Sequence, residues 1–260
     1  MLPEITVEEF ATALDETAMA LLATARIESP PVDAFRVAAA LGVIVAADDR
    51  QTGRARYVRL RRFDAVAQSG ARAAIPADGQ ASILMRREPR LERRQWAVGH
   101  ELGEHVAEEV FRRLGVDPSD AMPGMREEVA NHLANRLLLP TAWFGPDAQA
   151  FDWDLLKLKA RYRTASHELI ARRMLDFQPP VIVTVCDQGQ ITFRRSNLMQ
   201  RAVPLAPVER GCWHDVHQRA APATHSSGAL TVVGWPVHEP GWKREILRTA
   251  WSEGADLEYS

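Results

Sequence analysis

The residues His-Glu-Leu-Gly-Glu-His at positions 100–105 combine side chains that can bind a metal ion with one that can move a proton. On a helix, residues four apart lie on the same face, so His100 and Glu104 can point at one ion. Glu101 lies about 100° further round the helix, where its carboxylate can reach a water molecule at the ion without binding the ion. This spacing predicts a metal site in which Glu101 is the general base.

Glu104 stands where the HExxH pattern of zinc peptidases has its second histidine, so the pattern here is HExxE. His105 lies one position too far along, because an i+5 side chain points about 140° away from His100. An anionic ligand at position 104 lowers the net charge at the ion, which weakens the effect of the ion on the acidity of water.

A second helix is predicted over residues 125–139, and Glu127 near its start is a candidate third ligand. Three protein ligands would leave a fourth position open to water, as in catalytic zinc sites. Both helices also have interpretations without a metal. Glu127 and Glu128 would stabilise the N-terminus of the second helix, because their negative charges face the positive end of the helix dipole. The first helix has an apolar stripe that would pack in a protein core without any metal.

The pattern of residues around these two helices predicts an α+β fold. Apolar residues at helical spacing predict helices over residues 6–26, 33–41, 90–114 and 125–139, and β-branched or alternating runs predict strands over 43–48, 55–60, 71–76 and 81–87. Residues 153–175 are predicted to form two short helices. Beyond residue 180 the pattern indicates β structure, with a hairpin over 181–195 and a strand over 230–235.

Taken together, the two helices resemble the ImmA/IrrE family of metallopeptidases. The residues that carry the resemblance are the HELG helix, then Glu127, Ala130 and Asn131, and then Leu138, Leu139 and Pro140. The likeness extends over residues 10–175, and the rest of the chain resembles no family that we can name.

This resemblance implies a zincin-like metallopeptidase core over residues 1–178, including the helical segment 153–175, followed by a small β-rich region of unassigned role over 179–260. It implies that His100 and Glu127 bind the metal and that Glu101 is the general base, with Glu104 where the family has a ligand histidine. The implied metal is zinc. Manganese and iron(II) are alternatives, because one imidazole and two carboxylates favour harder ions.

The resemblance further implies a metal-dependent peptidase that cleaves a helix-turn-helix transcriptional repressor, supplied as a separate protein, and so switches on stress-response or mobile-element genes. Two alternatives stay open. Glu104 would mark an inactive pseudoprotease that acts by binding a partner, or residues 155–174 would form a DNA-binding helix-turn-helix. The DNA-binding alternative has weak support, because Arg172 and Arg173 alone make a thin basic face for a recognition helix.

Composition sets the expected environment of the protein. The formal net charge is −2, which gives no general attraction to nucleic acid or to a membrane surface. No apolar run is long enough for a membrane helix, the N-terminus is acidic where a signal peptide would be basic, and two cysteines suit a reducing compartment. We therefore expect a cytoplasmic protein that binds no membrane and does not bind nucleic acid directly.

A second group of metal-capable residues lies in the C-terminal region. Its members are Cys212, His214, His217, His225 and His238. Their spacing fits no standard zinc pattern, so the pattern favours roles in the fold over a second metal site.

Overall fold

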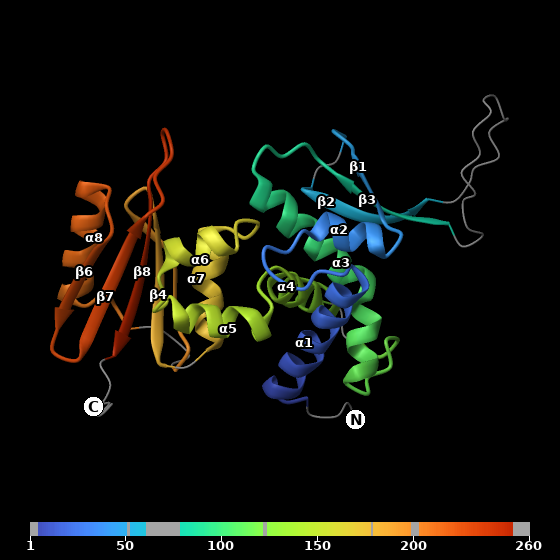
Figure 1. Cartoon of the computed structure of the whole chain (residues 1–260), viewed down its shortest axis with the longest axis horizontal. Helices are drawn as coiled ribbons and strands as arrows, with labels where there is room; N and C mark the ends of the chain where they lie inside the picture. Colours follow the sequence, from blue (N-terminus) through green and yellow to red (C-terminus); the bar gives the residue numbers. More distant parts are fainter. Residues whose placement is uncertain are drawn as a thin grey trace. The chain divides into compact units, whose positions relative to one another are not determined.

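The computed structural model describes residues 5–50, 53–60, 79–121, 124–177, 179–198 and 203–251. These residues form a mixed α+β structure (Figure 1). The backbone divides into two compact units, the first made of Met1–Phe144 and Arg161–Ala165, the second of Gly145–Ala160 and Ser166–Ser260. This division differs from the predicted boundary near residue 178, because the helical residues after 165 pack on strands of the second unit.

The helices of the first unit follow the predicted pattern closely. They are α1 (Val7–Thr24), α2 (Ala34–Ala40), α3 (Leu91–Arg113) and α4 (Met125–Leu138). Thr6 starts α1 with a capping box, in which its hydroxyl accepts a hydrogen bond from the backbone N–H of Glu9 at 3.1 Å. Helix α5 (Thr141–Ala150) was not predicted, because Gly145 and Pro146 interrupt its helical pattern.

A three-stranded sheet belongs to the same unit. Its strands are β1 (Ile44–Ala47), β2 (Ala55–Leu60) and β3 (Gln80–Met85), in the order β1-β3-β2. Strand β3 pairs in parallel with β1 and antiparallel with β2, so β2 is an edge strand of this sheet. The strand predicted over 71–76 lies outside the described residues.

Helix α3 is the central element of the first unit. It packs against α1, α2, α4 and both β2 and β3. The predicted apolar stripe is Val98, Leu102, Val106 and Val110; three of these residues have no exposed surface, and Val106 is half-buried. The polar residues of the HELGEH sequence lie on other faces of α3. His100 lies beside α4, and Glu101 lies beside β2.

The second unit is built on a five-stranded antiparallel sheet. The strands are β4 (Val181–Asp187), β5 (Gln190–Ser196), β6 (Ala223–Ser227), β7 (Leu230–Pro236) and β8 (Arg244–Trp251), in the order β5-β4-β8-β7-β6. The predicted hairpin turn is confirmed, with Gln188 and Gly189 both at positive φ. The short helices α6 (Leu155–Arg161) and α7 (His167–Arg173) are also confirmed, and the 3-10 turn η1 (Met174–Asp176) follows α7.

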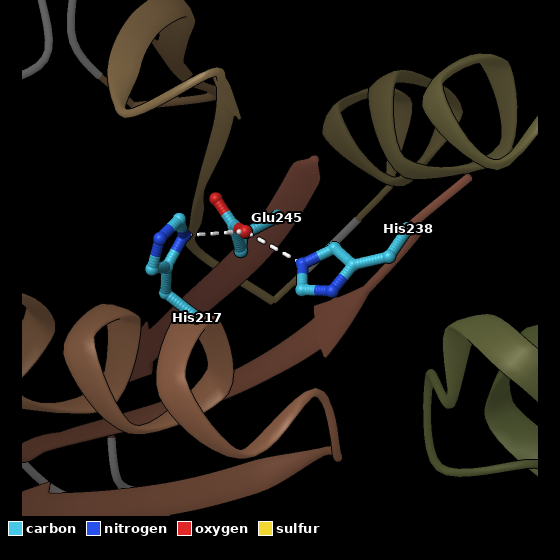
Figure 2. A group of neighbouring side chains, drawn as sticks. All are labelled: His217, His238 and Glu245. Carbon is cyan, nitrogen blue, oxygen red and sulfur yellow. Dashed lines mark hydrogen bonds and ion pairs between the residues drawn. The ribbon is translucent and has the colours of Figure 1, made fainter. Parts of the chain in front are cut away.

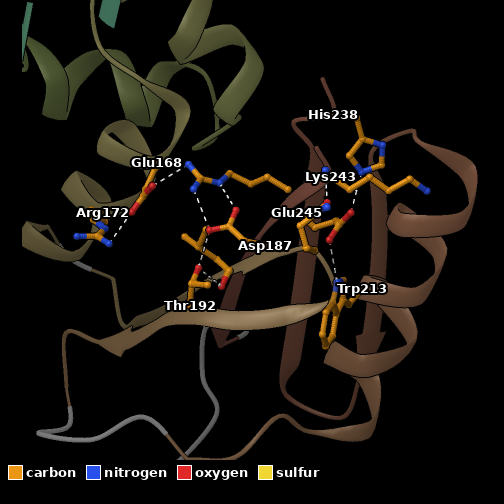
Figure 3. A network of polar contacts seen from close by, with 11 residues as sticks. Glu168, Arg172, Asp187, Thr192, Trp213, His238, Lys243 and Glu245 are labelled. Carbon is orange, nitrogen blue, oxygen red and sulfur yellow. Dashed lines mark hydrogen bonds and ion pairs between the residues drawn. The ribbon is translucent and has the colours of Figure 1, made fainter. Parts of the chain in front are cut away.

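Helix α8 (Pro207–Arg219), which the pattern did not predict, covers one face of this sheet. Side chains of β8 alternate between the two faces. Glu245 points to α8, where Trp213 contacts it (Figure 3). Arg244, the residue before it, donates to Asp187 and to Glu168 of α7. Within the described residues, no helix is both long enough and apolar enough to cross a membrane.

Candidate metal centre

The structure brings together the side chains of His100, Glu104 and Glu127. The Nε2 atom of His100 lies 4.0 Å from Oε1 of Glu104 and 3.5 Å from Oε2 of Glu127. The three potential ligand atoms all lie within 4.8 Å of one another. One turn of α3 and the first turn of α4 thus supply the three residues that the sequence predicted as metal ligands.

Close packing of α3 on α4 places Glu127 beside His100. A Cβ atom at Gly103 would lie 2.6 Å from Cα and 2.9 Å from the carbonyl oxygen of Ala130, so only glycine fits at this crossing without movement of backbone. One turn away, Gly99 faces Ala134 at an ordinary contact distance of 3.6 Å. The glycine of the HELG sequence therefore allows the two helices to pack closely.

Neighbouring side chains orient the candidate ligands. The Trp96 ring stacks on the His100 ring at 5.2 Å between centroids, and its indole Nε1–H donates to Oδ1 of Asn135 at 3.2 Å. Asn131 donates to Oε1 of Glu127 at 3.2 Å, while the other oxygen of Glu127 faces His100. Such support for ligand side chains is usual at metal sites.

The sequence analysis did not single out Trp96, and it named Asn131 without predicting its contact with Glu127, although each lies four positions from the candidate ligand it contacts. Trp96 lies four residues before His100, and Asn131 lies four residues after Glu127. In contrast, Nδ1 of His100 is buried and has no hydrogen-bond partner among the residues that the structure describes. Ligand histidines usually donate from this second nitrogen, so this part of the usual arrangement is absent at His100.

Glu101 is buried next to the cluster and is held by β2. Its side chain accepts a hydrogen bond from the backbone N–H of Tyr57 at 2.6 Å. Burial raises the pKa of Glu101 above its ordinary value, and repulsion from Glu104 and Glu127 adds to this, while the Tyr57 hydrogen bond and His100 oppose it. A raised pKa suits a carboxylate that takes up and releases a proton.

His105 does not join the cluster. Its ring stacks on the Tyr57 ring at 4.8 Å between centroids. Burial lowers the pKa of His105, and the positive charge of Arg59 lowers it further, so the neutral imidazole is favoured. This placement agrees with the predicted direction of an i+5 side chain.

The residues at the cluster fit a divalent cation. One imidazole nitrogen and two carboxylate oxygens are acceptable ligands for zinc and for harder ions such as manganese or iron(II). The two negative charges of Glu104 and Glu127 would balance a divalent charge. Their side chains are 40% and 60% exposed, so solvent reaches the cluster from this side.

The second group of metal-capable residues separates in the structure. Cys212 lies in the core between α8 and the sheet, and His225 pairs with Asp215 at 2.9 Å. His217 and His238 instead converge on Glu245, a residue that the sequence pattern did not indicate. Glu245 is far from His217 in sequence, and only the pairing of β7 with β8 and the packing of α8 bring them together.

The two arginines of the helix-turn-helix-like segment make contacts inside the second unit. Arg172 pairs with Glu168 and lies over the Phe193 ring at 4.1 Å. Arg173 is buried and pairs with Asp176. Both arginines that a DNA-recognition helix would use here are thus paired with carboxylates of the same unit.

Comparison with known proteins adds information on the fold. The chain matches no family model and no curated protein. It is similar to the solved structure of a Mycobacterium tuberculosis transcriptional regulator, with a TM-score of 0.65 and 15% identity over 94% of this chain and 81% of that chain. At this level of identity, the similarity concerns the fold alone.

Proposed function

We propose that this protein is a metal-dependent peptidase in which His100, Glu104 and Glu127 hold a divalent ion and Glu101 is the general base. The observation that carries the proposal is the convergence of three ligand atoms within 4.8 Å, from two helices, beside a buried carboxylate of raised pKa. Zinc is the expected ion, and manganese or iron(II) is also compatible with the two carboxylates.

The bound ion would polarise the scissile carbonyl and increase the acidity of water at the site. Glu101 takes the proton from the attacking water and delivers it to the leaving amine. The Tyr57 N–H holds one oxygen of Glu101, which fixes the direction of the carboxylate and leaves the other oxygen for the proton. Burial and the neighbouring carboxylates favour the protonated form that must follow the first transfer.

The proposed substrate is a transcriptional repressor with a helix-turn-helix domain, cleaved as a separate protein. The resemblance of the HELG helix and of α4 to ImmA/IrrE peptidases supports this substrate class. The likeness in fold to a protein described as a transcriptional regulator is compatible with a role in transcription. Cleavage would relieve repression of stress-response or mobile-element genes.

The test is a cleavage assay on repressors encoded beside the gene, with zinc, manganese or iron(II) supplied. Glu101→Gln keeps the size of the side chain and removes the base, so we expect it to lower the cleavage rate by about 10²-fold or more. Glu92→Gln, in the first turn of the same helix, is the control and should keep the rate. Equal rates for wild type and Glu101→Gln would overturn the assignment of the base.

A pseudoprotease is the second candidate, and two observations favour it. Glu104 stands in place of a histidine, and among the described residues Nδ1 of His100 has no hydrogen-bond partner. A pseudoprotease would bind the repressor with equal affinity in wild type and Glu101→Gln and would cleave it in neither. Cleavage that depends on Glu101 would exclude this candidate.

A further inference from the structure

His217, His238 and Glu245 form a compact cluster in the second unit (Figure 2). Nδ1 of His217 and Nε2 of His238 lie 2.9 and 2.7 Å from the same oxygen, Oε1 of Glu245. His217 comes from α8, Glu245 from β8, and His238 from the connection between β7 and β8. All potential ligand atoms of the cluster lie within 4.8 Å of one another.

Glu245 has no exposed surface, although it is a carboxylate. Its Oε2 accepts from the indole N–H of Trp213 at 3.1 Å, which leaves Oε1 for the two imidazoles (Figure 3). In the described part of the chain, only these two histidines form ion pairs with Glu245. Burial of an uncompensated carboxylate costs free energy, so a positive charge is expected among these three side chains.

Rigid elements hold the three side chains in place. A Cβ atom at Gly234 would lie 2.7 Å from Cγ2 of Val216 and 2.8 Å from Cδ2 of Leu247, so this glycine lets α8 approach the sheet closely. Val216 precedes His217 directly. The backbone N–H of Val237 donates to the carbonyl of Arg244 at 2.7 Å, next to His238 and Glu245. The cluster is therefore built on packed backbone instead of on free surface side chains.

We propose that His217, His238 and Glu245 bind a divalent cation of the zinc type, which links α8 to the β7–β8 hairpin. Ligand bonds of about 2.0–2.2 Å in a tetrahedron place ligand atoms about 3.3–3.6 Å apart. The present separations of 2.7 and 2.9 Å therefore need to expand by less than about 1 Å. The side chains of His217 and His238 are 31% and 17% exposed, so the histidine side of the cluster is open to a water ligand.

This site differs from the α3–α4 site in its ligands. Two imidazoles and one carboxylate favour zinc more strongly than one imidazole and two carboxylates do, because the additional carboxylate favours harder ions. The proposal is independent of peptidase activity, because none of its ligands belongs to the first unit.

The test is zinc binding to the full chain by equilibrium dialysis, in the double variant His100→Ala/Glu127→Ala. This background removes the α3–α4 ligands, and we expect it to bind about one equivalent of Zn²⁺. Adding His217→Ala or His238→Ala should abolish that equivalent. His225→Ala, which removes a histidine of the same unit outside the cluster, should retain it.

Folding is checked by circular dichroism, and His238→Ala is the safest variant because its side chain lies in a connection between strands. Replacement of zinc by Co²⁺ in the background protein gives a second readout, since His and carboxylate ligands produce visible absorption bands that His238→Ala should lose. A background protein that binds no Zn²⁺ would overturn the proposal, and so would equal binding by His238→Ala and His225→Ala. Either result would leave a proton shared among the three side chains as the compensation for Glu245. A wild-type chain that binds only the equivalent of zinc that His238→Ala removes, and no second equivalent, would count against the proposed peptidase and not against this site.

Discussion

At the scale of single residues, Glu104 decides how strongly a metal at the α3–α4 site would activate water. Together with Glu127 it places two carboxylates beside one imidazole. Two anionic ligands neutralise a divalent ion and reduce its strength as a Lewis acid. The site should therefore hold an ion well but activate water less than a site with a second imidazole.

Glu104→His restores a neutral ligand at this position and should increase the rate of repressor cleavage. We expect a gain in kcat/KM of about tenfold, equivalent to ~1.4 kcal/mol in the activation free energy. Steady-state kinetics at saturating zinc measures the effect, and Glu128→His on the exposed face of α4 is the control. A rate that stays constant while the α3–α4 site still holds its metal would contradict this role of Glu104.

At the scale of elements, the distance between α3 and α4 sets the geometry of the candidate site. Gly103 permits the contact with the Ala130 backbone, and Glu127 lies one turn before Ala130 on α4. Any added side chain at this crossing moves backbone against backbone. The position of Glu127 relative to His100 thus depends on a residue that is not itself a ligand.

Gly103→Ala should lower the free energy of unfolding by about 1–3 kcal/mol, because the new methyl group overlaps the Ala130 backbone. It should also weaken metal binding by moving Glu127 away. Gly99→Ala provides the matched comparison, since its Cβ meets Ala134 at 3.6 Å and alanine is favoured over glycine in a helix by about 1 kcal/mol. Urea unfolding measures both variants. Equal stability of the two would show that the crossing is not tight.

At the scale of the whole molecule, the two cysteines report on the folded state of the second unit. Burial raises the pKa of Cys186 to about 12, with the charges of Glu245 and Asp187 adding to the effect. Burial also raises the pKa of Cys212 to about 11. Because the thiolate is the reactive form, both thiols should be inert at neutral and mildly alkaline pH while the unit is folded.

A chromogenic disulfide reagent should label neither cysteine in the native protein at pH 8, and both cysteines after unfolding in guanidinium. Raising the pH toward the pKa of Cys212 should increase labelling of the native protein only gradually, since burial also blocks access. Rapid labelling of one full equivalent in the native protein would contradict the described packing of β4 or α8.

Local patterns predicted much of the first unit, and long-range packing determined what they missed. The periodicity of α3 indicated the face on which His100 and Glu104 lie, and the i, i+4 rule held for this pair. Glu245 could not be predicted as a partner of His217, because that contact depends on strand pairing and on helix packing. The division into compact units differs from the predicted boundary for the same reason: α7 has a helical pattern, but its sequence does not show which sheet it packs on.

The central claim is that Glu127, with His100 and Glu104, holds a divalent ion, and metal content tests it most directly. The wild type, Glu127→Gln and Glu128→Gln are purified without chelator and analysed for zinc, manganese and iron. The two glutamates are adjacent and both exposed on α4, but only Glu127 faces His100. We predict that Glu127→Gln contains about one equivalent less metal than the wild type and that Glu128→Gln contains the same amount. Equal metal content in all three proteins would contradict the site.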